Sequence, residues 1–351
     1  METVEKREGN FERAAIFLSL ARESDPCHLS ALRADLLHLP TAYDMNSPAP
    51  LVLSFHGWSM SSQNNREWMG FTSNIQEENY ITVFPDGKRD CLSQGNCWSS
   101  WNAGGASFNG AGGPGPNGGW TCHQSTGNCQ ACADSCRPLG VCNSENNRNC
   151  NWATCVDDVS FVDQLLTQLE NKLCVDRARV FASGESMGGM MAWQLAESLP
   201  HRFAAVAPTV GSPHQGWAAA PATTEQISVL NLHARNDQVV PPGGGQSSDG
   251  WFFESVAVLM NVWGDYNACG GVSAAWPNPI GAGPGNLNME CTMPATGCRA
   301  SSEVVTCAIQ GCHFRQIEEF FGELAYFFFM SHPKTEEWFV ANQLSNRTSS
   351  V

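Results

Sequence analysis

The chain has 351 residues, of which 42% are hydrophobic, enough to bury the core of one full-sized α/β domain. Its formal net charge of -15 disfavours binding to nucleic acid and to anionic membrane surfaces, because both require clustered Lys and Arg. No apolar run approaches the roughly 20 residues that a membrane-spanning helix needs. The sequence therefore predicts a soluble protein with a neutral partner.

The N-terminal segment differs in character from the rest of the chain. Its apolar stretch, residues 14–21, follows acidic residues where a signal peptide has basic ones. We therefore predict that residues 1–30 are an appendage or the remnant of a leader. The rest divides into one α/β catalytic domain over residues 31–335 and a polar tail over residues 336–351.

Short apolar, strand-like runs alternate with helical stretches along the domain. Such alternation is typical of a mostly parallel sheet that helices cover on both faces. The helical period over residues 159–173 predicts one of these helices, with Asp157 and Asp158 as its N-terminal caps. The strand-like runs are residues 50–55, 80–84, 178–183, 204–210, 227–233 and 303–309.

The first of these strands ends in a His-Gly turn, His56-Gly57. A loop in this place can supply a backbone N–H that stabilises an oxyanion on a neighbouring strand. We predict that Trp58 or Ser59 is this donor. His56 and Gly57 are predicted to support the turn, without taking part in proton transfer.

A Gly- and Cys-rich insertion occupies residues 104–155. It cannot build an apolar core of its own, so we predict that disulfides fix it and that the protein is secreted into an oxidising compartment. The alternative is a zinc site at Cys129, Cys132 and His123, which lacks a second well-spaced ligand pair. The seven cysteines of the insertion are Cys122, Cys129, Cys132, Cys136, Cys142, Cys150 and Cys155.

The segment Gly184-Glu185-Ser186-Met187-Gly188 lies where a strand-like run stops and an amphipathic helix begins. This is the setting of a nucleophile elbow, in which a strained turn lifts the serine hydroxyl clear of the sheet. A side chain at Gly184 or Gly188 would collide with neighbouring backbone. Ser186 is therefore the predicted nucleophile, and the amide of Met187 is the predicted first oxyanion donor.

A serine hydroxyl needs a base and an orienting carboxylate. Asp237 follows the strand-like run 227–233, and His313 follows the run 303–309, which matches the order Ser, Asp, His of α/β-hydrolases. Two other histidines compete with His313. His233 lies inside a strand and fits a buried, hydrogen-bonded residue better, whereas His332 lies at the end of the last helix and is predicted to cap it.

Tryptophans surround the insertion, which we predict to fold over the mouth of the site as a lid or a substrate platform. Their rings suit stacking on a phenolic ring or a sugar, and burial inside the insertion is the alternative. They are Trp98, Trp101, Trp120 and Trp152.

Several segments, from Arg33 to Phe329, together resemble one family. The chain is similar to the polyhydroxybutyrate depolymerase and feruloyl esterase-like group of secreted α/β-hydrolases. The resemblance implies the α/β-hydrolase fold and a catalytic triad at Ser186, Asp237 and His313. The shared segments are residues 50–57, 83–87, 97–98 with 101–105, 156–161, 184–191, 202–208 and 237–241.

Two departures from the family pattern concern the substrate pocket. Phe314-Arg315 follow His313, where family members have Trp-Pro, so Phe314 is a further predicted substrate contact. The elbow has Met187 where many relatives have Asn.

These patterns predict a serine esterase that needs neither a metal nor an organic cofactor. The first substrate choice is a feruloyl or related ester on a polysaccharide. A short-chain polyester such as polyhydroxybutyrate, or acetylated xylan, is the alternative. A catalytically idle carbohydrate-binding module is the alternative from a different class, and a complete Ser, Asp and His set argues against it.

Overall fold

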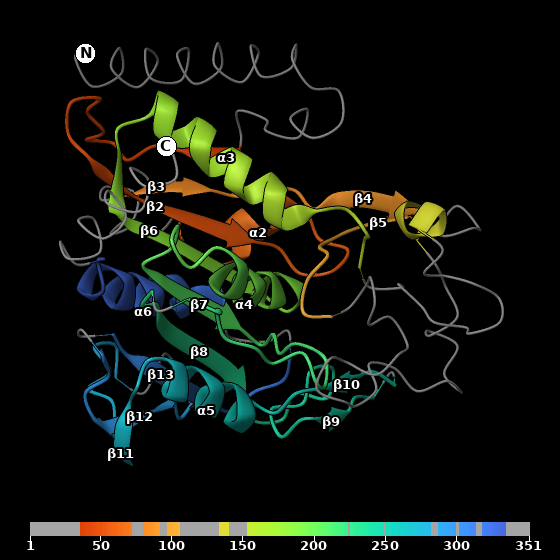
Figure 1. Ribbon diagram of the computed structural model, residues 1–351, viewed down its shortest axis with the longest axis vertical. Helices are drawn as coiled ribbons and strands as arrows, with labels where there is room; N and C mark the ends of the chain where they lie inside the picture. Colours follow the sequence, from red (N-terminus) through yellow and green to blue (C-terminus); the bar gives the residue numbers. More distant parts are fainter. Residues whose placement is uncertain are drawn as a thin grey trace, which may run out of the picture.

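In the computed structural model of the protein, the described residues are 36–71, 80–91, 97–105, 133–139, 153–223, 225–248, 250–281, 287–299, 302–313 and 318–334. Within these ranges, one nine-stranded sheet has the order β1-β3-β2-β6-β7-β8-β13-β12-β11 (Figure 1). Its strands are β1 Leu37–His38, β2 Ala49–Phe55, β3 Ile81–Val83, β6 Val175–Glu185, β7 Ala205–Thr209, β8 Ser228–Ala234, β11 Gly270–Ala275, β12 Glu290–Thr296 and β13 Val304–Ile309.

The middle of the sheet is parallel. Strands β3, β2, β6, β7, β8 and β13 pair in parallel, whereas β1, β12 and β11 are antiparallel at the two edges. The six parallel strands are the six runs expected from the sequence, so the prediction of a mostly parallel sheet is confirmed. Because these six strands are parallel, all of them end at the same edge of the sheet, which brings their following loops together.

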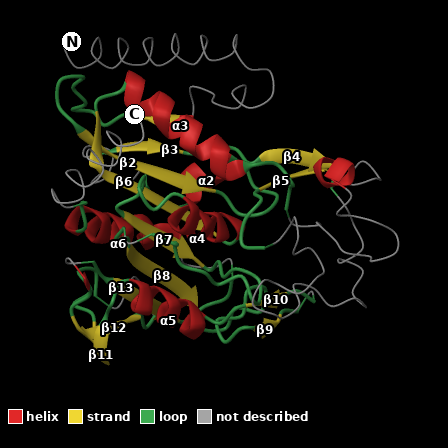
Figure 2. Cartoon of the chain, viewed as in Figure 1, coloured by secondary structure: helices red, strands yellow, loops and turns green. Residues whose placement is uncertain are grey.

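Both faces of the sheet are covered because alternate strand residues point to opposite sides. In β2, Leu51 and Leu53 pack with helices α3, α4 and α5, whereas Val52 packs with helix α6. Figure 2 shows the helices on either side of the strands. The helices are α2 Ser62–Trp68, α3 Asp158–Lys172, α4 Met187–Ser198, α5 Val256–Tyr266 and α6 Glu318–Ser331.

Smaller elements lie beside the sheet. The hairpin of β4 Lys88–Cys91 and β5 Cys97–Ser100 lies next to the 3₁₀-helix η4 Asp134–Leu139 (Figure 1). The second small pair is β9 Gly245–Gln246 with β10 Phe252–Phe253. None of the helices in the described part of the chain combines the length and the apolar character that crossing a bilayer demands.

Disulfides are present, as the sequence predicts. The bonds between described residues are Cys91–Cys97, Cys136–Cys155, Cys269–Cys298 and Cys291–Cys307. Cys307 and Cys312 bracket the approach to His313 in the sequence, where a bridge at Cys312 could hold the loop. The structure has no such bridge, because the thiol of Cys312 is free and exposed while Cys307 is bonded to Cys291. The zinc alternative at Cys129, Cys132 and His123 lies outside the described residues.

Candidate active site

Ser186 lies on a sharp turn between β6 and α4. Its backbone has φ 56° and ψ -115°, a left-handed conformation that a residue with a Cβ adopts only under strain. A Cβ atom at Gly184 would lie 2.3 Å from the carbonyl oxygen of Gly188, and one at Gly188 would lie 2.0 Å from that of Phe55. The strand, turn and helix predicted for this segment are therefore present, and glycine is required at both flanking positions.

Three side chains that follow three different strands meet at this turn. The hydroxyl of Ser186 lies 2.9 Å from Nε2 of His313, and Nδ1 of His313 lies 2.6 Å from Oδ2 of Asp237. All three side chains are buried. With Nδ1 protonated, the ring donates to the carboxylate and Nε2 accepts from the hydroxyl, which is the arrangement that a general base requires.

The carboxylate of Asp237 is fixed by its own loop. Its Oδ1 accepts the backbone N–H groups of Val239, at 2.9 Å, and Val240, at 2.8 Å. These bonds leave Oδ2 directed at His313. The orientation of the imidazole is therefore set by the backbone after β8.

His233 supports the same loop from inside β8. Its Nε2 lies 2.8 Å from the carbonyl oxygen of Val240 and 3.6 Å from Oδ2 of Asp237. Burial lowers the pKa of His233, so the ring is neutral and its Nε2–H donates to Val240. The sequence interpretation of His233 as a buried, hydrogen-bonded residue is confirmed.

His332 lies away from the turn, at the end of α6. Its Nδ1 is 2.6 Å from the carbonyl oxygen of Phe328, and its Nε2 is 3.4 Å from Oε2 of Glu303. The bond to His332 holds the pKa of Glu303 below its usual range. The predicted role of His332 as a residue that caps the helix end is confirmed.

Two backbone amides, those of Met187 and Trp58, are predicted oxyanion donors. Met187 is the first residue of α4, where N–H groups have no acceptor within the helix. Gly57, which precedes Trp58, lies so close to the turn that a Cβ atom added to it would be 3.4 Å from Cβ of Ser186. The alternative donor, Ser59, is a wrong prediction, because its N–H donates to the carbonyl oxygen of Ser99 at 2.9 Å.

His56 holds the loop that carries Trp58. Its Nε2 accepts the N–H of Gly87 at 2.8 Å, so the ring proton is on Nδ1, which lies 2.7 Å from the carbonyl oxygen of Gly57. Burial lowers the pKa of His56 and keeps the ring neutral. Both hydrogen bonds described for the ring of His56 are to backbone groups, which fits the predicted supporting role.

The predicted substrate contacts divide into two groups. Trp98 is half-buried and packs against Trp58, with ring centroids 5.1 Å apart. Trp101 is a wrong prediction, because it is fully buried and its Nε1 donates to the carbonyl oxygen of His56 at 2.9 Å. The other predicted contacts, Trp120, Trp152 and Phe314, lie outside the described residues.

Asp158 has a role that the sequence does not reveal. Asp157 caps α3 by accepting the N–H of Ser160, as predicted, but Asp158 instead accepts the N–H of Asn102 at 2.6 Å. Burial raises the pKa of Asp158 to about 7. This carboxyl group therefore ties the segment after β5 to the start of α3.

A metal site needs several ligand side chains that lie close together. Over the described ranges, no group of three or more His, Cys, Asp and Glu side chains has an arrangement that could hold a metal ion.

Parts of the chain are similar in sequence to feruloyl esterases. No protein-family model matches the chain. The chain is 39% identical to the probable feruloyl esterase C of Aspergillus niger over 101 residues. This match covers 28% of this chain and 36% of that protein. Over 166 residues the chain is 30% identical to feruloyl esterase B of Piromyces equi. This match covers 45% of this chain and 29% of that protein. The resemblance to feruloyl esterases is confirmed for this part of the chain.

The solved structures extend the comparison to the fold. The acetyl xylan esterase from Aspergillus awamori superposes with a TM-score of 0.50 at 13% identity. The match covers 84% of this chain and 93% of that one. The chain has the α/β-hydrolase fold. The sequence matches are shorter, since the chain spans about a third of the length of the feruloyl esterases C.

Proposed function

We propose that the protein is a serine carboxylic-ester hydrolase in which Ser186 is the nucleophile, His313 the base and Asp237 the orienting acid. One observation carries the proposal: a buried, continuous hydrogen-bonded series, with 2.9 Å from serine to imidazole and 2.6 Å from imidazole to carboxylate. The strained turn at Ser186 supports it, because such strain is retained where it presents a reactive group.

The proposed reaction proceeds by acyl transfer. Nε2 of His313 takes the proton from the Ser186 hydroxyl as its oxygen attacks the ester carbonyl, and the N–H groups of Met187 and Trp58 receive the oxyanion. The imidazolium is stabilised by Asp237 and gives its proton to the departing alcohol. Water then attacks the acyl-enzyme by the same route and releases the acid. Apart from the ester and water, these steps use the three side chains and the two backbone N–H groups.

A feruloyl ester on a polysaccharide is the proposed substrate. The matches to feruloyl esterases B and C support this choice, and so does a pair of half-exposed indole rings beside the proposed oxyanion loop. A neutral polymeric ester also suits a chain with a net charge of -15, which would repel polyanions. The disulfides support an oxidising compartment, and we propose that the protein is secreted.

Acetylated xylan is the second candidate. It rests on the fold shared with an acetyl xylan esterase, which is a weaker argument because one fold hosts many specificities. A polyhydroxybutyrate-type polyester has no specific observation in its favour.

The test is hydrolysis of methyl ferulate, p-nitrophenyl acetate and p-nitrophenyl butyrate by the oxidised protein and its Ser186→Ala variant. We expect turnover of methyl ferulate that the Ser186→Ala change removes. Ser273→Ala, at an exposed serine of β11, is the matched control and should retain full activity. Activity on the short esters alone would redirect the proposal to acetyl or polyester substrates. Folded protein without serine-dependent turnover would refute the esterase and favour a binding module.

A further inference from the structure

Two tryptophans from different elements pair beside the proposed oxyanion loop. Trp58 follows Gly57, where an added Cβ would lie 3.4 Å from Cβ of Ser186, and Trp98 lies in β5. Their ring centroids are 5.1 Å apart, and the ring planes are inclined by 41°. Both indoles are only partly buried. The indole pair therefore begins one residue from Gly57, whose backbone lies close to Ser186.

A backbone hydrogen bond fixes the loop to the hairpin. The N–H of Ser59 donates to the carbonyl oxygen of Ser99 at 2.9 Å, so the residues that follow Trp58 and Trp98 are joined directly. The two segments that carry the rings are thus held together by backbone contact. The disulfide Cys91–Cys97 closes the hairpin at the pair adjacent to Trp98.

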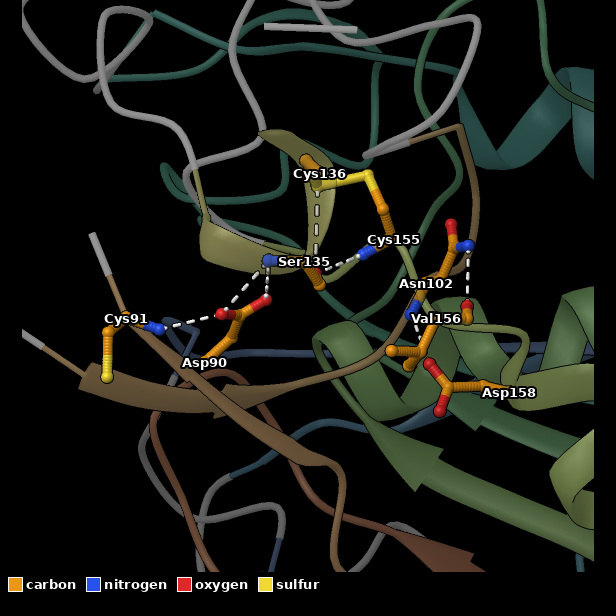
Figure 3. Close-up of a disulfide and its surroundings, with 8 residues drawn as sticks. All are labelled: Asp90, Cys91, Asn102, Ser135, Cys136, Cys155, Val156 and Asp158. Atoms are coloured by element: carbon orange, nitrogen blue, oxygen red, sulfur yellow. Dashed lines mark hydrogen bonds between the residues drawn. A yellow bond between two sulfur atoms is a disulfide. The ribbon is translucent and has the colours of Figure 1, made fainter. Parts of the chain in front are cut away.

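The strand opposite Trp98 is anchored as well. Its partner in the hairpin is Asp90, a buried residue whose carboxylate accepts the N–H of Ser135 at 3.0 Å. The Ser135 hydroxyl in turn accepts the N–H of Cys155 at 2.9 Å, and Cys155 is bonded to Cys136 (Figure 3). The hairpin is thereby held to η4 and to the segment that leads into α3.

We infer that Trp58 and Trp98 form an aromatic subsite that binds a planar aromatic ring of the ester, a proposal that rests on the proposed esterase function. Indole faces attract planar rings by stacking, and neither indole carries a charge that would favour an ionic group. Because the hairpin and the loop are already fixed, binding a ring orders few additional side chains. The ring is carried either by the acyl group, as in a feruloyl ester, or by the alcohol.

The test measures binding, so that it does not depend on turnover. The affinities of methyl ferulate, with its ring on the acyl side, and of phenyl acetate, with its ring on the alcohol side, are measured by ligand-observed NMR in a Ser186→Ala background. Trp98→Leu keeps apolar bulk but removes the ring, and Trp98→Phe keeps a ring. Trp68→Ala is the matched control, at a tryptophan that is 42% exposed at the end of α2.

We expect Trp98→Leu to weaken binding of the aromatic ester about three- to tenfold, which is the worth of one stacked ring. Trp98→Phe should restore most of this loss, and Trp68→Ala should change nothing. Weakening for methyl ferulate places the ring on the acyl side, and weakening for phenyl acetate places it on the alcohol side. Unchanged affinity for both ligands, or no rescue by Phe, would overturn the subsite. Failure of the esterase proposal is separate, because it shows as absent hydrolysis by the parent protein.

Discussion

The proposed triad and the β4–β5 hairpin lie at the same edge of the molecule but are held by different interactions. The triad residues follow long buried strands, and the apolar core on both faces of the sheet sets their positions. The hairpin has no such core and depends on disulfides and on buried polar contacts such as that of Asp90. This difference implies that catalysis and substrate choice can be weakened separately.

The largest expected effect is at the triad. His313→Ala should lower kcat by about 10⁴-fold or more, because the serine loses its base. His332→Ala, at the rival histidine, should leave kcat within a few-fold and lower the melting temperature, since it removes a helix cap. Steady-state kinetics and thermal unfolding of both variants measure this. Loss of activity in His332→Ala alone would reverse the assignment.

Removing the disulfide Cys136–Cys155 attacks the other region. A bond across 19 residues is worth about 3 kcal/mol of unfolding free energy. We expect Cys136→Ala with Cys155→Ala to lose about that stability in urea titrations and to raise KM for aromatic esters more than it lowers kcat. The control is the removal of Cys269–Cys298 beyond α5, which should cost stability without the selective rise in KM. An equal change in KM from both pairs would contradict the separation of the two regions.

His233 tests how closely the triad depends on its supporting loop. His233→Leu leaves the Val240 carbonyl without its donor, and we expect kcat to fall about ten- to hundredfold, as for a small misplacement of a catalytic group. His233→Gln can still donate an N–H and should recover part of the loss. The measurement is kcat and KM of the parent and both variants, because a displaced Asp237 misplaces the imidazole that it orients. Equal activity of the Leu and Gln variants would remove the positioning role.

The smallest effect on turnover is expected from Asp158→Asn, which acts on stability. Burial raises the pKa of Asp158 from 3.8 to about 7. The folded protein therefore binds one more proton than the unfolded chain between these pH values, and its unfolding free energy falls as pH rises from about 4 to about 7. The Asn variant should lack this slope, so its stability relative to the parent should increase up to about pH 7. Urea unfolding of the parent and the variant at pH 4, 6 and 8 measures this. The same dependence of unfolding free energy on pH in both proteins would contradict the prediction.

The sequence reveals the parts of the fold whose signal is local. Buried parallel strands read as continuous apolar runs, and the elbow has a short pattern of glycines around Ser186. Strand β11, with sequence GGVSAA, is largely exposed and has neither signal, so no sequence pattern marks it. A two-residue strand such as β1 has too few residues for any period.

The errors at the site have a common cause: residue type does not encode burial or the direction of a backbone group. Trp101 and Trp98 are three residues apart and chemically identical, yet only packing decides that one lies in the core. The amide of Ser59 cannot serve as an oxyanion donor because it already donates to Ser99 in β5, a strand that is distant in sequence. Asp158 differs from its exposed neighbour Asp157 because it is buried and accepts the N–H of Asn102.

The bare backbone contact at Gly188 determines how the site can evolve. Helix α4 touches the last carbonyl of β2 through a position that excludes every side chain. The spacing between the amides of Met187 and Trp58 is thus fixed by main-chain atoms, which mutation of side chains does not alter. Selection or engineering can therefore replace residues of the hairpin to accept new esters while the geometry of the proposed oxyanion site is inherited intact.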